Sequence, residues 1–167
     1  MTALELQKDL AEEIEDILKE MLLKDVKGRE THLKAFKQCL PKRKQEVDGN
    51  DVWGEEEGED PYPYCVVRID SGKLETAQSA NQVQTVLVFG IFDDDRECQG
   101  HQAILNMIHR ITERFTEDPM MKEKYRMNGE AGISWVLDEE DRYPYYFGAM
   151  EMTWDTFFVR RKEDRYV

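Results

Sequence analysis

The chain has 167 residues, of which 36 are acidic and 23 are lysine or arginine, so its net charge is −13. Nucleic acids and anionic membrane surfaces attract cationic proteins, and this charge balance argues against a protein that grips either of them as a whole. An acidic surface suits partners that carry basic patches.

The first predicted element is an amphipathic helix. We place it at residues 1–26, within a single domain that spans residues 1–167. Thr2 and Glu5 have the spacing of a capping box, and Gly28 is a plausible stop. Apolar residues recur at steps of three and four, which is the period of a helix with one buried face. These residues are Leu6, Leu10, Ile14, Ile17, Leu18, Met21 and Leu22.

Two blocks of opposite charge follow the predicted helix. Residues 27–44 are basic, whereas residues 46–60 are acidic and contain no lysine or arginine. The basic block is either a patch for nucleic acid or a partner, or a connection whose charge the acidic block partly neutralises, and we favour the connection. We predict an acidic flexible loop at residues 45–60, because such a composition buries too little to order itself. Trp53 is the exception in this loop, and it is a candidate for contact with the body or with a neighbouring subunit.

A long hairpin is predicted next. Residues 64–70 alternate so that Cys65, Val67 and Ile69 share one face, and Ser71-Gly72 is expected to turn the chain. Residues 82–92 form the most strand-like run of the sequence, and its second half is apolar on both faces, which predicts a central and covered strand. The polar segment between the strands is expected to be a hairpin arm or a flexible loop. It supplies the interface candidates Lys73, Leu74, Glu75, Gln78 and Asn81.

A second helix is predicted from about Arg96 to Thr116. The acidic run Asp93–Asp95 stands before it, where the helix dipole favours anions. Residues 120–128 are expected to form a short helix or an irregular excursion. The buried face of the second helix is expected to consist of Ile104, Met107, Ile108, Ile111 and Phe115.

Two further strands complete the prediction, at residues 133–137 and from Tyr146 to about Arg160. A charged tail follows at residues 161–167. The fold class is therefore α+β, with a largely antiparallel four-stranded sheet at residues 61–160, packed by the N-terminal helix and the long central helix. Arg160 and Arg161 join the interface candidates.

The search for chemistry finds one carboxylate cluster. Asp93, Asp94, Asp95 and Glu97 could hold the magnesium ion of a nucleic-acid enzyme, although no lysine stands where such an enzyme needs one. No nucleotide-binding loop is present, and Cys98 and His101 lack further zinc ligands nearby. We expect no catalytic residue, no cofactor and no metal site.

Three widely spaced cysteines indicate no disulfide framework. The N-terminus lacks the basic start and apolar centre of a signal peptide, and no apolar run reaches the roughly 18 residues of a membrane span. We expect a protein made in a reducing cytoplasm.

The sequence resembles the tail-terminator proteins of long-tailed bacteriophages, which belong to the tail-completion and neck group. Three stretches carry the likeness across roughly residues 60–160. They are Val66-Val-Arg-Ile-Asp-Ser-Gly72 leading through the polar arm to Val86-Leu-Val-Phe-Gly-Ile-Phe-Asp93, the helix Gly100-His-Gln-Ala-Ile-Leu-Asn-Met-Ile108, and Trp135 followed by Tyr143-Pro-Tyr-Tyr-Phe-Gly148 and Met150-Glu-Met-Thr-Trp154.

The resemblance implies a structural virion protein and not an enzyme. Such proteins form a homohexameric ring that caps the tail tube, stops its polymerisation and joins it to the head-side connector. The implied partners are other copies of the chain, the tail tube protein and the connector, with DNA passing through the lumen without specific binding and no membrane involved. The alternatives are a metal-dependent nucleic-acid enzyme that uses residues 93–97, or another neck or adaptor protein that binds a basic partner.

Overall fold

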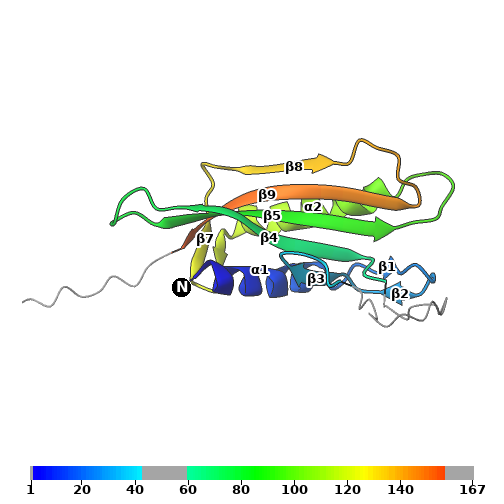
Figure 1. The fold of residues 1–167 in the computed structure, drawn as a ribbon, viewed down its shortest axis with the longest axis horizontal. Coiled ribbons are helices and arrows are strands. Elements are labelled where there is room, and N and C mark those ends of the chain that lie inside the picture. The colour runs from blue at the N-terminus through cyan, green and yellow to red at the C-terminus, as the bar shows by residue number, and fades with distance from the viewer. Residues whose placement is uncertain (1, 43–59, 157–167) are drawn as a thin grey trace, which may run out of the picture.

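The structure is a computed structural model, and it describes residues 2–42 and 60–156 (Figure 1). It is a mixed α+β fold with two helices and a mostly antiparallel, curled sheet, as the sequence predicts. The elements in chain order are α1 (Ala3–Leu18), β1 (Leu23–Lys24), β2 (Glu30–Thr31), β3 (Lys34–Lys37), β4 (Tyr64–Lys73), β5 (Asn81–Phe92), α2 (His101–Glu117), β6 (Met120–Met121), β7 (Tyr125–Met127), β8 (Ile133–Leu137) and β9 (Tyr145–Thr156).

The main sheet has seven strands in the order β3-β4-β5-β9-β7-β6, and β8 also pairs with β9. The four predicted strands are present as β4, β5, β8 and β9, and the bounds of β8 match the prediction. The sheet is nevertheless wider than the predicted four strands. The additional strands β3, β6 and β7 are two to four residues long, too short to show a period of two.

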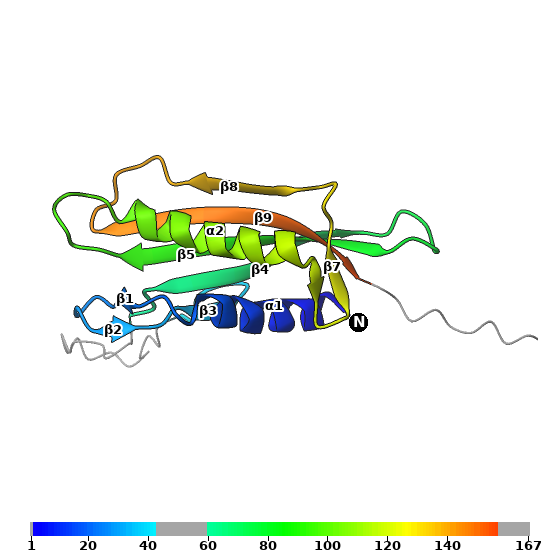
Figure 2. The same cartoon turned by 180° about the vertical axis from the view of Figure 1, so that it is seen from behind.

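A single core lies between one face of the sheet and both helices. The inward residues of β5 and β9 alternate as predicted, and Phe89, Met150 and Trp154 are fully buried. Figure 2 shows α2 crossing β5 and β9, with α1 along the β3 side of the sheet. The core side chains of the helices are Leu6, Leu10, Ile14 and Leu18 of α1 and Ile104, Met107, Ile108, Ile111 and Phe115 of α2.

Helix α1 begins as predicted. The Thr2 N–H donates to Glu5 Oε2 at 2.9 Å, and the Glu5 N–H donates to Thr2 Oγ1 at 3.2 Å, which completes the capping box. The helix ends at Leu18, so the predicted span of 1–26 is too long. Asp25 organises a hairpin in its place, because its carboxylate accepts the N–H groups of Lys27 and Arg29.

Polar contacts fix α1 against α2 and against the segment that follows α2. Arg114 Nε of α2 donates to Glu13 Oε1 at 3.0 Å, and the Tyr125 hydroxyl of β7 donates to Asp9 Oδ2 at 3.1 Å. Lys122 Nζ lies 2.6 Å from Glu12 Oε2. The segment that carries Lys122 and Tyr125 is the β6–β7 hairpin, so the predicted short helix or irregular excursion at 120–128 is wrong.

Helix α2 starts at His101, about a turn later than predicted. Its N-cap is Gly100, which offers no side-chain cap, and the first turn holds no acidic residue. Asp93 and Asp95 instead accept the N–H groups of Asp95 and Glu97, each at 3.0 Å. The dipole effect is confined to the first turn of a helix, so the prediction that the dipole of this helix favours the acidic run is wrong.

Close packing of α2 on the sheet depends on Gly148 of β9. A Cβ atom added at this residue would lie 2.7 Å from Ile104 Cγ2 of α2. Ile104 is fully buried, so its methyl group has little room to move.

We therefore predict that Gly148→Ala lowers the free energy of unfolding by about 1–3 kcal/mol, the usual cost of overpacking a core. The measurement is urea denaturation followed by circular dichroism. Gly129→Ala is the matched control, because a Cβ atom at Gly129 meets nothing within 4 Å. Equal stability of the two variants would contradict the packing seen between α2 and β9.

Burial separates the three cysteines. Cys65 is fully buried on the inner face of β4, and burial raises the pKa of its thiol far above the ordinary value. Cys39 and Cys98 are exposed. Neither described helix has the length and apolar character needed to cross a membrane.

Thiol titration with Ellman's reagent should therefore label Cys39 and Cys98 in the native protein and leave Cys65 unreacted. All three thiols should react in denaturant. A Cys65→Ala variant should give the same native count as the wild type. Rapid native labelling of three thiols would show that the β4 face is not closed by the helices.

Candidate assembly surfaces

The most prominent surface feature is the arm formed by β4 and β5. The two strands remain paired to Lys73 and Gln82, with a register shift between Ile69 and Ser71. The predicted turn at Ser71-Gly72 is wrong, because β4 continues through both residues. Figure 1 shows the hairpin projecting beyond the N-terminus of α1.

The tip of the arm carries four of the predicted interface residues. Lys73, Leu74, Glu75 and Gln78 are all exposed, and Leu74 exposes 50% of its surface. Lys73 Nζ lies 2.9 Å from Glu75 Oε1, and this exposed ion pair contributes little to stability.

The remaining predicted interface residues lie elsewhere. Asn81 is the first residue of β5, and its carbonyl accepts the Thr156 hydroxyl of β9 at 3.2 Å. It therefore belongs to the base of the arm. Trp53, Arg160 and Arg161 lie outside the described residues.

One edge of the sheet is closed by side chains. Strand β3 pairs with β4 as far as Val67, and the Gln38 side chain then replaces a strand residue. Its Oε1 accepts the Ile69 N–H at 3.0 Å, and its Nε2 donates to the Ile69 carbonyl at 3.2 Å. Gln7 of α1 holds this amide by donating to Gln38 Oε1 at 2.9 Å. Farther along β3, the Ala35 N–H donates to Glu15 Oε1 of α1 at 2.9 Å.

On the opposite side of the sheet, beyond β9, the outer strand is β8 at one end and β6 at the other. Within the described residues β8 pairs with β9 alone, so its outer side carries the unpaired backbone groups of an edge strand. Trp135 and Val136 point to opposite faces and expose 54% and 59% of their surfaces. The strand contains no charged residue, and charges are the usual protection of an edge.

The face of the sheet away from the helices carries one apolar row. A register row crosses this face from β8 to β3, and no described helix covers it. The prediction that both faces of β5 are covered is therefore wrong for the described residues, in which Val86 and Val88 are only half-buried. The row consists of Val136, Ala149, Val88, Val66 and Phe36.

Aromatic side chains border this apolar row. The Tyr62 ring lies 4.8 Å from Tyr145 and 6.2 Å from Phe147, measured between centroids. The Tyr64 ring lies over Gly90, where a Cβ atom would approach it to 2.3 Å. Burial raises the pKa of Tyr64 to about 12, so its hydroxyl stays neutral at physiological pH.

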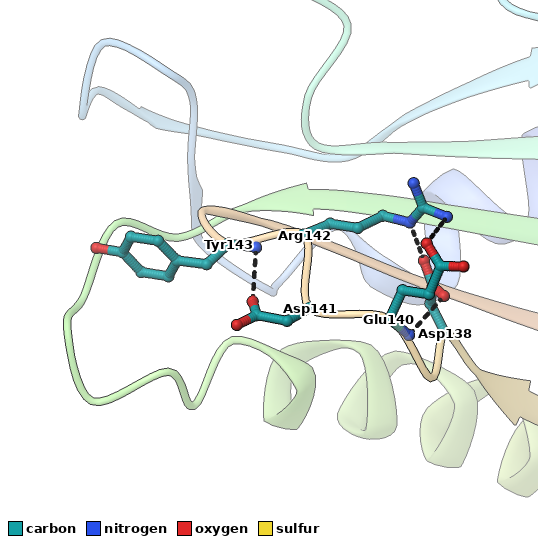
Figure 3. Close-up of polar contacts among 5 residues, drawn as sticks. All are labelled: Asp138, Glu140, Asp141, Arg142 and Tyr143. Atoms are coloured by element: carbon teal, nitrogen blue, oxygen red, sulfur yellow. Dashed lines mark hydrogen bonds and ion pairs between the residues drawn. The ribbon is translucent and has the colours of Figure 1, made fainter.

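Two acidic loops meet at the end of the molecule opposite the arm. The Tyr143 hydroxyl donates to the Asp94 carbonyl at 2.5 Å, and the Asp93 N–H donates to the Pro144 carbonyl at 2.9 Å. These bonds join residues 93–97 to residues 138–144. Figure 3 shows the second loop, in which the Arg142 guanidinium reaches the carboxylates of Asp138 and Glu140.

The acidic loops contain the carboxylates that the sequence offers as candidates for holding a metal ion. Within residues 2–42 and 60–156, no group of three or more histidine, cysteine, aspartate or glutamate side chains has an arrangement that could hold a metal ion. Comparison with models of known protein families gives no match, and a search of curated proteins finds no relative.

The arm surface gives a prediction about stability. Replacing residues 74–80 by Asn-Gly should change the free energy of unfolding by less than about 1 kcal/mol, because no residue of the segment is buried and loop closure depends weakly on length. Thermal and urea denaturation measure this change.

Val83→Ala is the matched control in the same hairpin. Val83 is 1% exposed, and its truncation should cost about 2 kcal/mol. If shortening the arm destabilised the protein as much as Val83→Ala does, the tip would be part of the folded body and not a free surface.

Proposed function

We propose that this chain is a structural protein of a long-tailed phage virion, a tail terminator. In this role, several copies form a ring, expected to be a hexamer, that caps the tail tube, stops its polymerisation and joins it to the head-side connector. The protein is assembled in the host cytoplasm and ends in the tail or neck of the virion. The proposal assigns it no catalytic activity, no cofactor and no membrane contact.

The observation that carries the proposal is the projecting β4–β5 arm. The tip of this hairpin, residues 74–80, extends beyond both helices and pairs with no other strand of the described chain, whereas β5 stays paired with β9 up to Asn81. Held at the end of the paired strands β4 and β5, this tip has the reach to contact a neighbouring subunit or the tube. Its four exposed candidates, Lys73, Leu74, Glu75 and Gln78, are then contact residues.

The two unlike edges of the sheet support a ring. A ring needs a heterologous interface, in which each copy presents two different surfaces that match each other. Here one edge is β8 with Trp135 and Val136 exposed, and the other is β3 with α1 beside it. The resemblance of residues 60–160 to tail terminators supports the same arrangement.

The acidic charge is compatible with a conduit for DNA. A chain with a net charge of −13 offers little general attraction to phosphate groups. DNA would therefore pass through a lumen lined by acidic residues without binding to it. The head-side connector and the tail tube protein are the remaining proposed partners.

This function predicts a ring that binds tube ends. Multi-angle light scattering should give a mass of several copies, and negative-stain electron microscopy should show rings on the ends of tubes polymerised from the tube protein of the same phage. Added protein should shorten tubes in a growing reaction.

The variant with residues 74–80 replaced by Asn-Gly should keep its fold and lose tube binding. Val83→Ala serves as a control for general destabilisation, because it retains the arm tip. A wild-type protein that stays monomeric both alone and with tubes, and that leaves tube length unchanged, would refute the proposed function.

A further inference from the structure

One register row runs across the sheet from the β8 edge to the β3 edge. Residues at the two edges can therefore be compared at the same position along the strands. Residues that follow β8 and residues that precede β3 lie at the same end of the molecule, opposite the arm (Figures 1 and 2). Four strand spacings of about 4.8 Å separate the two edges by about 19 Å. The row consists of Leu137, Gly148, Phe89, Cys65 and Ala35.

The edge formed by β8 is acidic at this end. Residues 138–141 are four consecutive acids, against one cation at Arg142. Arg142 pairs with Asp138 and with Glu140, whose side chain remains 74% exposed (Figure 3). Glu139 and Asp141 are also exposed. The acidic loop therefore keeps a net negative charge beside the exposed Trp135 and Val136.

The opposite edge is basic at the same end. Residues 19–42 contain seven lysines and arginines and three acids, within a chain whose overall charge is strongly negative. Lys24 and Lys27 are exposed on the β1–β2 hairpin, and the Arg29 side chain is 71% exposed. Asp25, one of the three acids, accepts the N–H groups of Lys27 and Arg29 and also pairs with the Arg29 guanidinium, whose Nε lies 2.9 Å from Asp25 Oδ2.

Each edge combines its charge with an exposed apolar side chain. Leu22 exposes 63% of its surface next to the basic hairpin, and Trp135 exposes 54% of its surface beside the acidic loop. Ala35 of β3 already donates its N–H to Glu15, so this position is closed to strand pairing. Contact at the basic edge therefore involves side chains and not an extension of the sheet.

We infer that the occupant of each edge is a second copy of this chain, with the acidic edge of one copy against the basic edge of the next. The acidic edge comprises Trp135, Val136 and residues 138–141, and the basic edge comprises Leu22, Lys24, Lys27 and Arg29. This inference rests on the proposed ring and specifies its contact. Each copy supplies one edge of each sign, so the contact is heterologous. Parallel pairing of two β8 edges would place the two acidic loops side by side, which like charges disfavour.

Charge reversal tests the contact. The acidic-edge variant is Glu139→Lys with Glu140→Lys, and the basic-edge variant is Lys24→Glu with Lys27→Glu. Sedimentation velocity of the wild type should show self-association that weakens as NaCl rises from roughly 50 to 500 mM. Each variant alone should raise the apparent dissociation constant about tenfold or more at low salt, because like charges then face each other.

Two rescues separate a specific contact from general damage. An equimolar mixture of the two variants should assemble, since every contact in it pairs opposite charges. The chain that carries all four substitutions should also assemble by itself. The matched control for the acidic-edge variant is Glu117→Lys with Glu130→Lys. It makes the same change in net charge, but at the end of the molecule that bears the arm, and it should associate like the wild type.

A wild type that remains monomeric at low salt and high concentration would overturn the inference. So would variants that assemble like the wild type, or a mixture that stays dissociated. Rings that cap tubes regardless of these charges would refute this contact and leave the proposed function standing. Charge-dependent rings that do not bind tubes would support this contact and refute the proposed function.

Discussion

The packing of both helices on one face of the sheet is the constraint from which the other features follow. Gly148 lets Ile104 of α2 approach the strands, and Phe115 meets Trp154 edge-on with ring centroids 4.9 Å apart. Gln7 reaches from α1 to Gln38 and the Val67 carbonyl and seals the edge of β4. A sheet needs its apolar face buried against another layer, and here the two helices together form that layer. The other face and the two lateral edges are left for contacts outside the described fold.

Local patterns predicted those elements whose stability is local. The bounds of β8, the capping box of Thr2 and Glu5, and the inward alternation of β9 each depend on neighbouring residues in the chain. The end of α1 was missed because Met21 and Leu22 continue the helical period, although Leu22 is largely exposed. Periodicity does not show that Asp25 supplies acceptors for a turn that competes with the helix.

The candidate surfaces also divide into one that local sequence predicts and others that it does not. The arm was predicted, with a flexible loop as the alternative, because a polar segment between two strands is visible in the sequence. The two edges were not, since a strand becomes an edge only through the order of the whole sheet. The basic segment was interpreted as a connection, but it contains β2 and β3, and the parallel pairing of β3 with β4 places it at the border of the sheet. Nothing in the local sequence shows that Leu137 and Ala35 lie in the same register row of the sheet.

Segregated charge resolves a difficulty that the net charge raises for any assembly of this chain. Copies with a net charge of −13 repel each other on average. At physiological ionic strength charges are screened beyond about 8 Å, so repulsion between distant parts fades while charges in direct contact still act. An acidic edge against a basic edge is then attractive locally, and the reverse orientation is penalised. Charge of this kind fixes orientation more than it supplies affinity, so the buried area must come from apolar side chains such as Trp135 and Leu22, which stand exposed beside the two charged edges.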